Sequence, residues 1–172
     1  MMEASSFKEM DCPYTGERLA LVPAMKPDVT IVQAQRADEE GNVHFWGGSG
    51  VTREAALAAR KVIVVVEEVV SSGVIRRDPN RTLLPGFLVS AVVPEPWGAH
   101  PSPVQGYYHR DHPHYIAYHK ESKNREDYLR WLEKWVFEVK NREDYVKRLG
   151  EKRMGMLLVK GRRKSMPVDY GC

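Results

Sequence analysis

The stretch from residue 36 to residue 70 constrains the fold of this chain more than any other. A polar turn that contains a glycine, residues 37–42, follows an apolar run, and a short alanine-rich segment begins after Thr52. An uninterrupted apolar strand, Val62–Val66, comes next. This alternation of strands with a helix is typical of an α/β protein with a parallel sheet. Thr52 is expected to cap the helix, whose alanines allow close packing on the sheet.

Further strands are predicted around this stretch. Residues 29–35 are β-branched and apolar, as expected for a buried strand. Residues 43–46 resume an extended pattern after Gly41 and Asn42, which predicts a hairpin-like excursion. Residues 85–93 give another apolar strand. The sheet is therefore expected to hold strands from both sides of the alanine-rich helix.

The carboxyl-terminal third reads differently. Residues 94–113 carry five prolines among aromatic and histidine side chains and predict a long structured loop. The word Asn-Arg-Glu-Asp-Tyr then occurs twice, at 124–128 and 141–145. Each copy has an asparagine at a helix cap position and acids in the first turn, so two consecutive helices with the same start signal are predicted. Gly150 is expected to end the second helix.

Composition limits the class of protein. The chain has 172 residues, of which 28% are charged and 42% hydrophobic, as in an ordinary globular domain. No apolar run approaches the roughly 20 residues of a membrane-spanning helix, and no signal peptide is visible. Two widely separated cysteines, Cys12 and Cys172, suggest free thiols in a reducing compartment. We therefore expect a cytoplasmic protein with no membrane partner.

Two groups of acidic residues are candidates for chemistry. Glu67 and Glu68 follow the apolar strand, where one carboxylate could line a pocket and act as a base or nucleophile. Adjacent strand residues point to opposite faces, so only one is expected to face a given pocket. Glu17 and Arg18 lie in a glycine turn that could join an acid to an anion-binding group. A solvated strand end and a surface ion pair are the alternative interpretations.

Polar residues also follow the strand predicted at 29–35. Gln35 and Arg36 lie at its carboxyl end, where open α/β sheets bind ligands, and Arg36 could hold a phosphate or carboxylate. For Asp38 and Asn42 we favour a structural role, in which they lock the turn around Gly41.

Five histidines occur between residues 100 and 119, which raises the question of a metal site. Their spacing includes no His-x-x-x-His helix and no cysteine partner, so no metal is expected. The aromatic residues Trp131, Trp135 and Phe137 fit a core or interface role better than cofactor stacking.

Several words of the sequence resemble a known family. ADEEGN at 37–42, VEEVV at 66–70, CPYTGERL at 12–19 and PWGAHPSPVQGYY at 96–108 are similar to text in the A (alpha) subunits of family I coenzyme A transferases, in the glutaconate CoA-transferase-like subgroup. The resemblance runs from about Cys12 to Gly150 and corresponds to the carboxyl-terminal portion of such a subunit. It implies a three-layer α/β domain of the NagB/RpiA type, with a mainly parallel sheet and carboxyl-terminal helices.

The resemblance also implies a function. Family members move CoA between an acyl-CoA and a free carboxylic acid, using a nucleophilic glutamate that belongs to the partner B (beta) subunit. The CoA ester is a substrate, and no bound cofactor is expected. Residues of this chain that match or adjoin the family text become the site candidates. The catalytic candidates are Glu17, Arg18 and Glu68, and the candidates for binding substrate or CoA are Gln35, Arg36, Gly41, Asn42 and His100.

This chain departs from the family pattern at one end. The A-type subunits of the family begin with a glycine-rich segment that has no counterpart here. Either the chain is a fragment, or a separate A-type amino-terminal half supplies the missing part, and the chain alone is expected to be inactive. The predicted domains are an extension at 1–12, the family domain at 13–150 and a basic tail at 151–172.

Two other functions stay open at this point. One is a CoA-ester hydrolase that opens a steroid ring, because the PWGAHPSPV text occurs in proteins of that type. The other is a non-catalytic interaction module whose basic tail binds nucleic acid. No helix-turn-helix, zinc-finger or RNA-binding text supports the second, so no nucleic-acid partner is expected.

Overall fold

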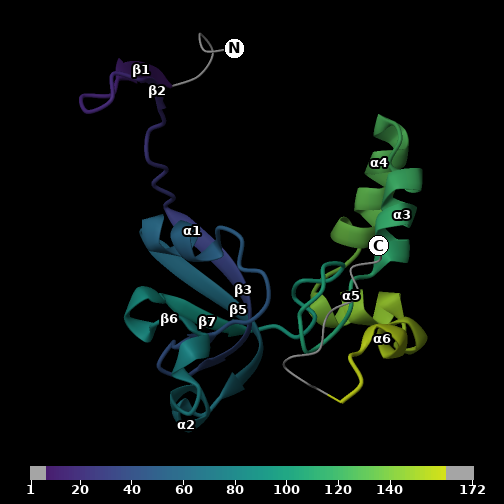
Figure 1. Cartoon of the computed structure of the whole chain (residues 1–172). Coiled ribbons are helices and arrows are strands. Elements are labelled where there is room, and N and C mark those ends of the chain that lie inside the picture. Colours follow the sequence, from purple (N-terminus) through teal and green to yellow (C-terminus); the bar gives the residue numbers. More distant parts are fainter. Residues whose placement is uncertain (1–6, 162–172) are drawn as a thin grey trace.

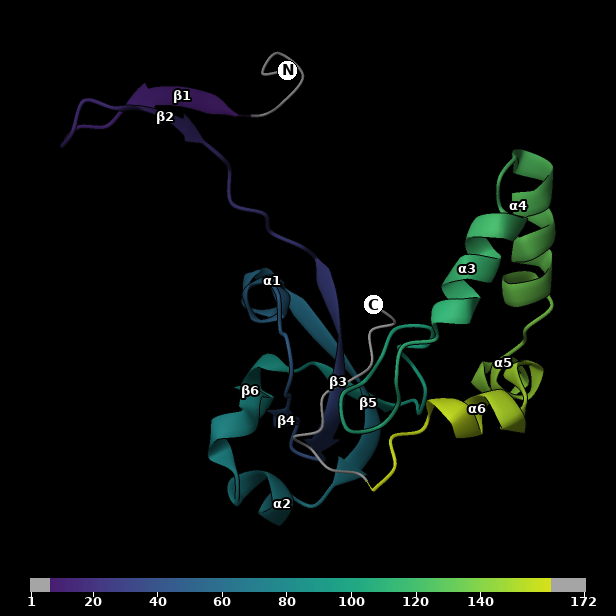
Figure 2. The same ribbon diagram turned by 45° about the vertical axis from the view of Figure 1, so that its right-hand side comes forward.

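The computed structural model describes residues 7–161 and divides them between a sheet, a helical group and a separate hairpin. The hairpin consists of β1 (Lys8–Asp11) and β2 (Arg18–Leu21), which pair in antiparallel fashion. An extended segment joins it to the rest of the chain, so that it stands away from both the sheet and the helices (Figures 1 and 2).

A five-stranded mixed sheet forms the centre of the molecule, with the strand order β6-β4-β3-β5-β7. Its strands are β3 (Val29–Asp38), β4 (Val43–His44), β5 (Lys61–Val70), β6 (Thr82–Leu84) and β7 (Ala91–Pro94). The pairs β3–β5 and β5–β7 are parallel, whereas the short strands β4 and β6 pair in antiparallel fashion. Most of the pairing is therefore parallel, and the predicted α/β fold is confirmed.

One face of this sheet packs against helix α1 (Thr52–Ala58). Side chains that alternate along β3 and β5 point to that face and are almost fully buried, together with Ala56 of the helix. Thr30 donates a hydrogen bond from Oγ1 to the backbone oxygen of Ala55 at 3.0 Å, which ties the helix to β3. The buried residues of this core are Val32, Ala34, Ala37, Val43, Ala56, Val62, Val64, Val66 and Leu84.

Three local predictions were wrong. Thr52 is the first residue of α1, and no side chain caps the helix. The strand predicted at 43–46 is limited to Val43–His44. Residues 85–93 form a 3-10 helix, Gly86–Leu88, before β7 begins at Ala91. The amide of Gly86 is drawn into a hydrogen bond with Asn42 Oδ1 at 2.9 Å, so this apolar segment leaves the extended conformation.

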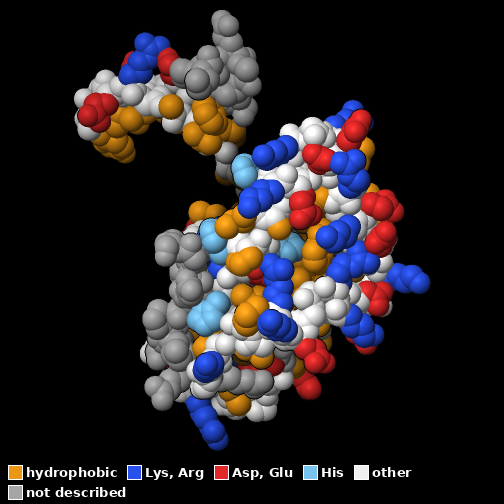
Figure 3. Space-filling view, turned by 90° about the vertical axis from the view of Figure 1, so that its right-hand side faces the viewer, with side chains coloured by type: hydrophobic (Ala, Val, Ile, Leu, Met, Phe, Trp, Pro, Cys, Tyr) orange, Lys and Arg blue, Asp and Glu red, His pale blue; other side chains and the backbone are white. Residues whose placement is uncertain are grey.

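The carboxyl-terminal helices lie to one side of the sheet. The long loop predicted at 94–113 runs between the sheet and these helices (Figure 1). They are α3 (His112–Glu121), α4 (Arg125–Leu132) with a π-helical turn at Glu133–Phe137, α5 (Arg142–Leu149) and α6 (Glu151–Leu157). Asn124 and Asn141 cap α4 and α5, and Gly150 ends α5 with φ +83°, so these predictions are confirmed. Figure 3 shows this side of the molecule, where basic and acidic side chains intermix.

Both segments that we assigned outside the family domain contain regular structure. Strand β1 lies in the predicted extension, and α6 lies in the predicted basic tail. Lys160 is exposed, while residues 162–164 and Cys172 lie outside the described residues. The domain boundaries stay a prediction. Among residues 7–161, no helix has the length and apolar character needed to cross a membrane.

Candidate functional site

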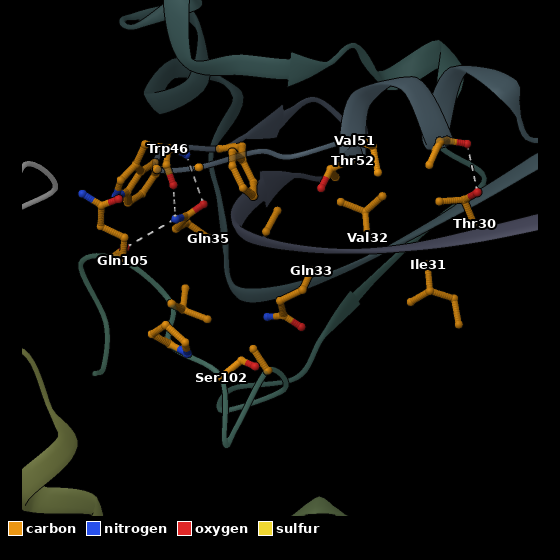
Figure 4. Close-up of a pocket in the computed structure, with 18 residues that line it drawn as sticks. Thr30, Ile31, Val32, Gln33, Gln35, Trp46, Val51, Thr52, Ser102 and Gln105 are labelled. Atoms are coloured by element: carbon orange, nitrogen blue, oxygen red, sulfur yellow. Dashed lines mark hydrogen bonds between the residues drawn. The ribbon is translucent and has the colours of Figure 1, made fainter. Parts of the chain in front are cut away.

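A cavity of about 440 Å³ opens beside β3, between the segment that precedes α1 and the long loop before α3 (Figure 4). Gln35, Trp46, Gly47, Thr52, Ser102 and Gln105 contribute polar groups or backbone to its wall. Val32, Ala34, Phe45, Val51 and Val104 supply apolar surface. Apolar walls with a few polar groups are the usual composition of a small-molecule site.

Gln35 connects the two walls of this cavity. Its Nε2 donates to the backbone oxygen of Trp46 at 2.7 Å and to that of Gln105 at 3.4 Å. Its Oε1 accepts from the Trp46 amide at 3.3 Å. Because the side chain is buried and its amide already serves the protein, Gln35 sets the width of the cavity.

Gly47 lies where Gln105 crosses the cavity wall. Its φ is +98°, a conformation that favours glycine. A Cβ atom at this position would collide with Oε1 of Gln105. A larger residue would therefore displace the end of the Gln105 side chain from its place in the cavity wall.

Arg36 lies beneath the cavity rather than in it. The side chain is buried, its Nε approaches His44 Nδ1 at 3.2 Å, and its guanidinium lies 5.6 Å from the centre of the Trp46 ring. His44 Nε2 lies 3.1 Å from the backbone oxygen of Ile75, which assigns the proton to Nε2 and leaves Nδ1 to accept from Arg36. The contact between Arg36 and a phosphate or carboxylate therefore stays a prediction.

Glu67 and Glu68 both line a second cavity, of about 410 Å³. Glu67 accepts hydrogen bonds from the Trp97 amide at 2.7 Å, the Tyr108 hydroxyl at 2.9 Å and Gln33 Nε2 at 3.1 Å. Burial raises the pKa of the Glu67 carboxyl above its ordinary value, although these hydrogen bonds oppose the shift.

Glu68 accepts a hydrogen bond from the Tyr107 hydroxyl at 2.7 Å. Burial raises the pKa of Tyr107, and the neighbouring Glu68 carboxylate adds to the shift. The expectation that only one of the two glutamates faces a given pocket was wrong. Strand β5 continues past both residues to Val70, whereas β7 ends at Pro94 opposite Val66. The edge of β5 is therefore open beside them, and side chains from both faces reach the same loop.

The turn after β3 is locked as predicted. Asp38 Oδ1 accepts from the Asn42 amide at 2.8 Å, and Gly41 has φ +85°. Burial opposes ionisation of Asp38, but hydrogen bonds from Asn42, Ser72 and the Glu40 backbone together outweigh it and hold the Asp38 pKa below its usual value. Gly41 borders a third cavity, of about 390 Å³, that is separate from the one beside Gln35.

His100 lies inside a hydrogen-bond network between the loop and the helices. Its Nε2 is 2.9 Å from Asp111 Oδ2, and its Nδ1 is 2.7 Å from the Tyr145 hydroxyl. Burial lowers the pKa of His100, so the ring is neutral. Arg153 also donates to Asp111 at 2.7 Å, and these bonds outweigh burial and hold the Asp111 pKa at about 2. The neutral ring thus donates to Asp111 and accepts from Tyr145.

Sequence reasoning identified His100 but not its partners. No short-range signal links Asp111, Tyr145 or Arg153 to position 100. Tyr145 lies in the repeated word, but the repeat gives no reason to separate it from Tyr128.

The structure does not bring Glu17 and Arg18 to any of these cavities. Thr15 Oγ1 donates to Glu17 at 3.2 Å, and Arg18 pairs with Glu9 across the hairpin. The two residues thus have separate partners on the hairpin, and their catalytic role stays a prediction. Within residues 7–161, no group of three or more metal-ligating side chains is placed to hold a metal ion.

Comparisons with known proteins give consistent results. The model of the family described as coenzyme A transferase matches residues 3–95. The chain is 44% identical to the A subunit of 3-oxoadipate CoA-transferase from Pseudomonas knackmussii, over 76% of this chain and 46% of that protein. It is 42% identical to the A subunit of glutaconate CoA-transferase from Acidaminococcus fermentans, over 86% of this chain and 47% of that protein.

Solved structures extend the likeness to the fold. The glutaconate coenzyme A-transferase of Acidaminococcus fermentans superposes with a TM-score of 0.86 at 40% identity, covering 91% of this chain and 50% of that one. A variant of the decarboxylase AibA/AibB gives a TM-score of 0.56 at 32% identity, covering 76% and 48%. The chain spans about half the length of the curated relatives it matches.

Proposed function

Because the chain belongs to the coenzyme A transferase family, we propose that it forms part of the A subunit of a heteromeric CoA transferase. The enzyme would move CoA between an acyl-CoA of the dicarboxylate type and a free carboxylic acid. One observation carries the proposal: 42% identity to the A subunit of a glutaconate CoA-transferase is combined with a TM-score of 0.86 to the solved glutaconate enzyme. The alternatives of a steroid-ring hydrolase and an interaction module have no comparable support.

The chemistry that we propose divides the transfer into two covalent steps. A glutamate carboxylate attacks the thioester carbonyl, CoA leaves as the thiolate, and a mixed anhydride forms. The thiolate then attacks the glutamyl carbonyl, which releases the first acid and leaves CoA on the enzyme as a thioester. The second acid reverses the sequence.

The candidate cavity fits a supporting role in this scheme. None of the residues that line the 440 Å³ cavity carries a carboxylate. This supports a nucleophilic glutamate supplied by a B subunit. We propose that Gln35 and Gln105 shape the wall against which the acyl group lies, while the roles of Arg36, Gly41, Asn42, His100 and Glu68 in binding or catalysis stay predictions.

The remaining parts of the proposal concern partners. The proposed partner is a B subunit, joined by an A-type amino-terminal half where a separate polypeptide supplies that half. The CoA ester is the substrate, with no resident cofactor and no nucleic acid. We place the enzyme in the cytoplasm.

An assembled complex tests the function. The chain would be co-expressed with an A-type amino-terminal half and with a B subunit, before glutaconyl-CoA is mixed with labelled acetate. We expect labelled acetyl-CoA and an enzyme-bound glutamyl-CoA thioester that borohydride can trap. Release of free CoA without an acceptor acid would indicate a hydrolase instead, and release of carbon dioxide would indicate a decarboxylase. An assembled complex that exchanges no dicarboxylyl-CoA would overturn the proposal.

A further inference from the structure

Two glutamines of β3 line the 440 Å³ cavity, but they use their side chains differently. Both ends of the Gln35 amide are bonded to the backbone of the protein. Gln33 donates from Nε2 to Glu67 Oε1 at 3.1 Å, and within residues 7–161 no donor reaches its Oε1. Gln33 is therefore the glutamine that keeps an atom for a ligand.

The orientation of the Gln33 amide follows from the other groups around Glu67. The Trp97 amide donates to Glu67 Oε2 at 2.7 Å. The Tyr108 hydroxyl accepts from the Ala99 amide at 3.2 Å, so its single proton is free to be donated to Glu67 Oε1 at 2.9 Å. Both carboxylate oxygens thus act as acceptors, and such a group can receive only the NH₂ end of Gln33.

The other end of this amide, Oε1, is a hydrogen-bond acceptor at the cavity. Figure 4 shows the end of the Gln33 side chain between β3 and the loop that carries Ser102. A Cβ atom at Gly98 would lie 2.8 Å from Gln33 Oε1, so the glycine leaves room for this oxygen. None of the described residues that line the cavity carries a charge, so polar recognition there depends on hydrogen bonds.

An acceptor in this position selects the part of the ligand that can lie against it. A carboxylate has acceptors only, so the acid group of a substrate gains nothing from Oε1. A CoA ester does carry a donor near its reacting end, because a short ethylene link joins the thioester sulfur to an amide N–H. This amide is the group of the ligand that complements Gln33.

We propose that Gln33 Oε1 accepts a hydrogen bond from this amide N–H, and that Glu67 is a positioning residue that holds the Gln33 amide in the required orientation. The inference rests on the proposed function. The acyl group then lies toward Gln35 and Gln105, and the thioester lies between the two glutamines of β3.

Two probes that differ in one group test the acceptor. S-acetyl-N-acetylcysteamine reproduces the thioester end of a CoA ester together with its amide N–H, and an analogue with oxygen in place of that N–H cannot donate. Ligand-observed NMR gives the dissociation constant of each probe for the assembled complex without any turnover. We expect the N–H probe to bind about 10-fold more tightly, because the analogue loses the bond and places a second acceptor against Oε1.

Variants separate the two proposed roles. Gln33→Met keeps the length of the side chain but removes the carbonyl, so both probes should bind within about twofold of each other. Glu67→Gln gives Gln33 a neighbour that can donate or accept, so the Gln33 amide is free to turn over and the preference should fall below about threefold.

Matched controls account for the loop and for the fold. Tyr108→Phe removes a different hydrogen bond from the same oxygen of Glu67 and should keep the preference at about 10-fold. Glu121→Gln changes an exposed residue of α3 and should alter neither affinity. Circular dichroism and thermal unfolding establish that each variant is folded.

The orientation of the amide is measured on the full chain alone. In the isotope-labelled chain, the NH₂ protons of Gln33 should exchange with water about 10-fold more slowly than in Glu67→Gln, because a bonded proton must first be released. Equal exchange in the two proteins would overturn the role of Glu67, whatever the complex binds.

Two further outcomes would overturn the inference. One is equal affinity for the two probes, or a preference that survives Gln33→Met. The other is a loss of preference in Tyr108→Phe as large as in Glu67→Gln, since the loop would then carry the effect. Failure of the proposed function looks different: a complex that prefers the N–H probe but transfers no CoA leaves the inference intact, whereas transfer without the preference retains only the function.

Discussion

Two helices of this chain begin with the same five residues but meet different surroundings. Helices α4 and α5 both start after an asparagine whose Oδ1 accepts from the amide three residues on, at 2.9 Å in each case. The tyrosine that ends the first word, Tyr128, is 39% exposed. Its counterpart Tyr145 hydrogen-bonds to the buried His100.

The arginines of the two words differ in the same way. Arg125 is exposed, whereas Arg142 donates to the Gly98 oxygen at 3.1 Å and lies 4.8 Å from the centre of the Tyr145 ring. The comparison shows that the asparagine and the acids determine where a helix begins. Which residues then become part of a network depends on what the rest of the fold brings to that helix.

The largest expected effect concerns the network that only the second copy reaches. Asp111→Asn removes the charge that holds both His100 and Arg153, and we expect a loss of about 3–5 kcal/mol of unfolding free energy, because a buried ion pair is broken. The control is Asp127→Asn, whose partner Arg130 is exposed, with an expected loss of under about 0.5 kcal/mol. Urea unfolding measures both, and equal losses would show that the network contributes nothing.

A smaller effect is expected at the two tyrosines. Tyr145→Phe leaves Nδ1 of the buried His100 without its donor and should cost about 1–3 kcal/mol. Tyr128→Phe removes a hydroxyl from the half-exposed copy and should stay within about 0.5 kcal/mol. Thermal unfolding of the two variants provides the comparison. If both tyrosines behave alike, the contrast drawn between the two helices is wrong.

The two asparagine caps should contribute equally to stability, unlike the tyrosines and aspartates. Asn124→Ala and Asn141→Ala each remove one capping bond of the same geometry, and each should cost about 1 kcal/mol. Glycine at either position should cost only a few tenths, since it is itself an acceptable cap. A cost confined to Asn141 would mean that the cap of α4 is not formed in solution.

The smallest expected effect is on the pH dependence of stability, which should fall on acidification. Burial lowers the pKa of His100 and of His114, so both stay neutral in the folded protein while an unfolded histidine takes up a proton below about pH 6.5. Their contribution to stability is therefore present above that pH and is lost as pH falls through their lowered pKa values.

Two variants isolate this dependence. His114→Phe keeps a ring between Trp131 and Trp135 and should flatten the decline of the melting temperature between about pH 7.5 and 5.5. His119→Gln changes an exposed residue and should leave the decline as it is. A melting temperature that rises on acidification over this range would contradict the assignment.

Local patterns predicted the parts of the fold that depend on nearby residues. The β-branched runs at β3 and β5, the lock between Asp38 and Asn42, and the asparagine caps all follow from contacts within a few positions. Helix α3 was missed because its residues, His112–Glu121, mix polar and aromatic side chains without an apolar stripe. The strand predicted at 85–93 failed because a contact 44 residues away, from Asn42 to Gly86, bends the segment.

The candidate site was predictable only in its strand residues. Gln35, Glu67 and Glu68 could be singled out because polar side chains at the end of an apolar strand are unusual. Their partners Trp46, Gln105 and Tyr108 come from loops 11 to 70 positions away, so no spacing rule reveals them. The loop predicted at 94–113 spans 95–111 in the structure, and its path over the sheet depends on these distant hydrogen bonds.

Trp97 has φ +66°, a backbone conformation that a bulky residue adopts at a cost of about 1–3 kcal/mol. Its amide is held by Glu67, and its ring stacks on Tyr108 at 4.3 Å. The hydrogen bond from Glu67 and the ring contact with Tyr108 thus offset the cost of the backbone conformation at Trp97. Variants at Glu67 or Tyr108 would therefore alter the path of the loop that lines the 440 Å³ cavity without changing a residue of the cavity wall.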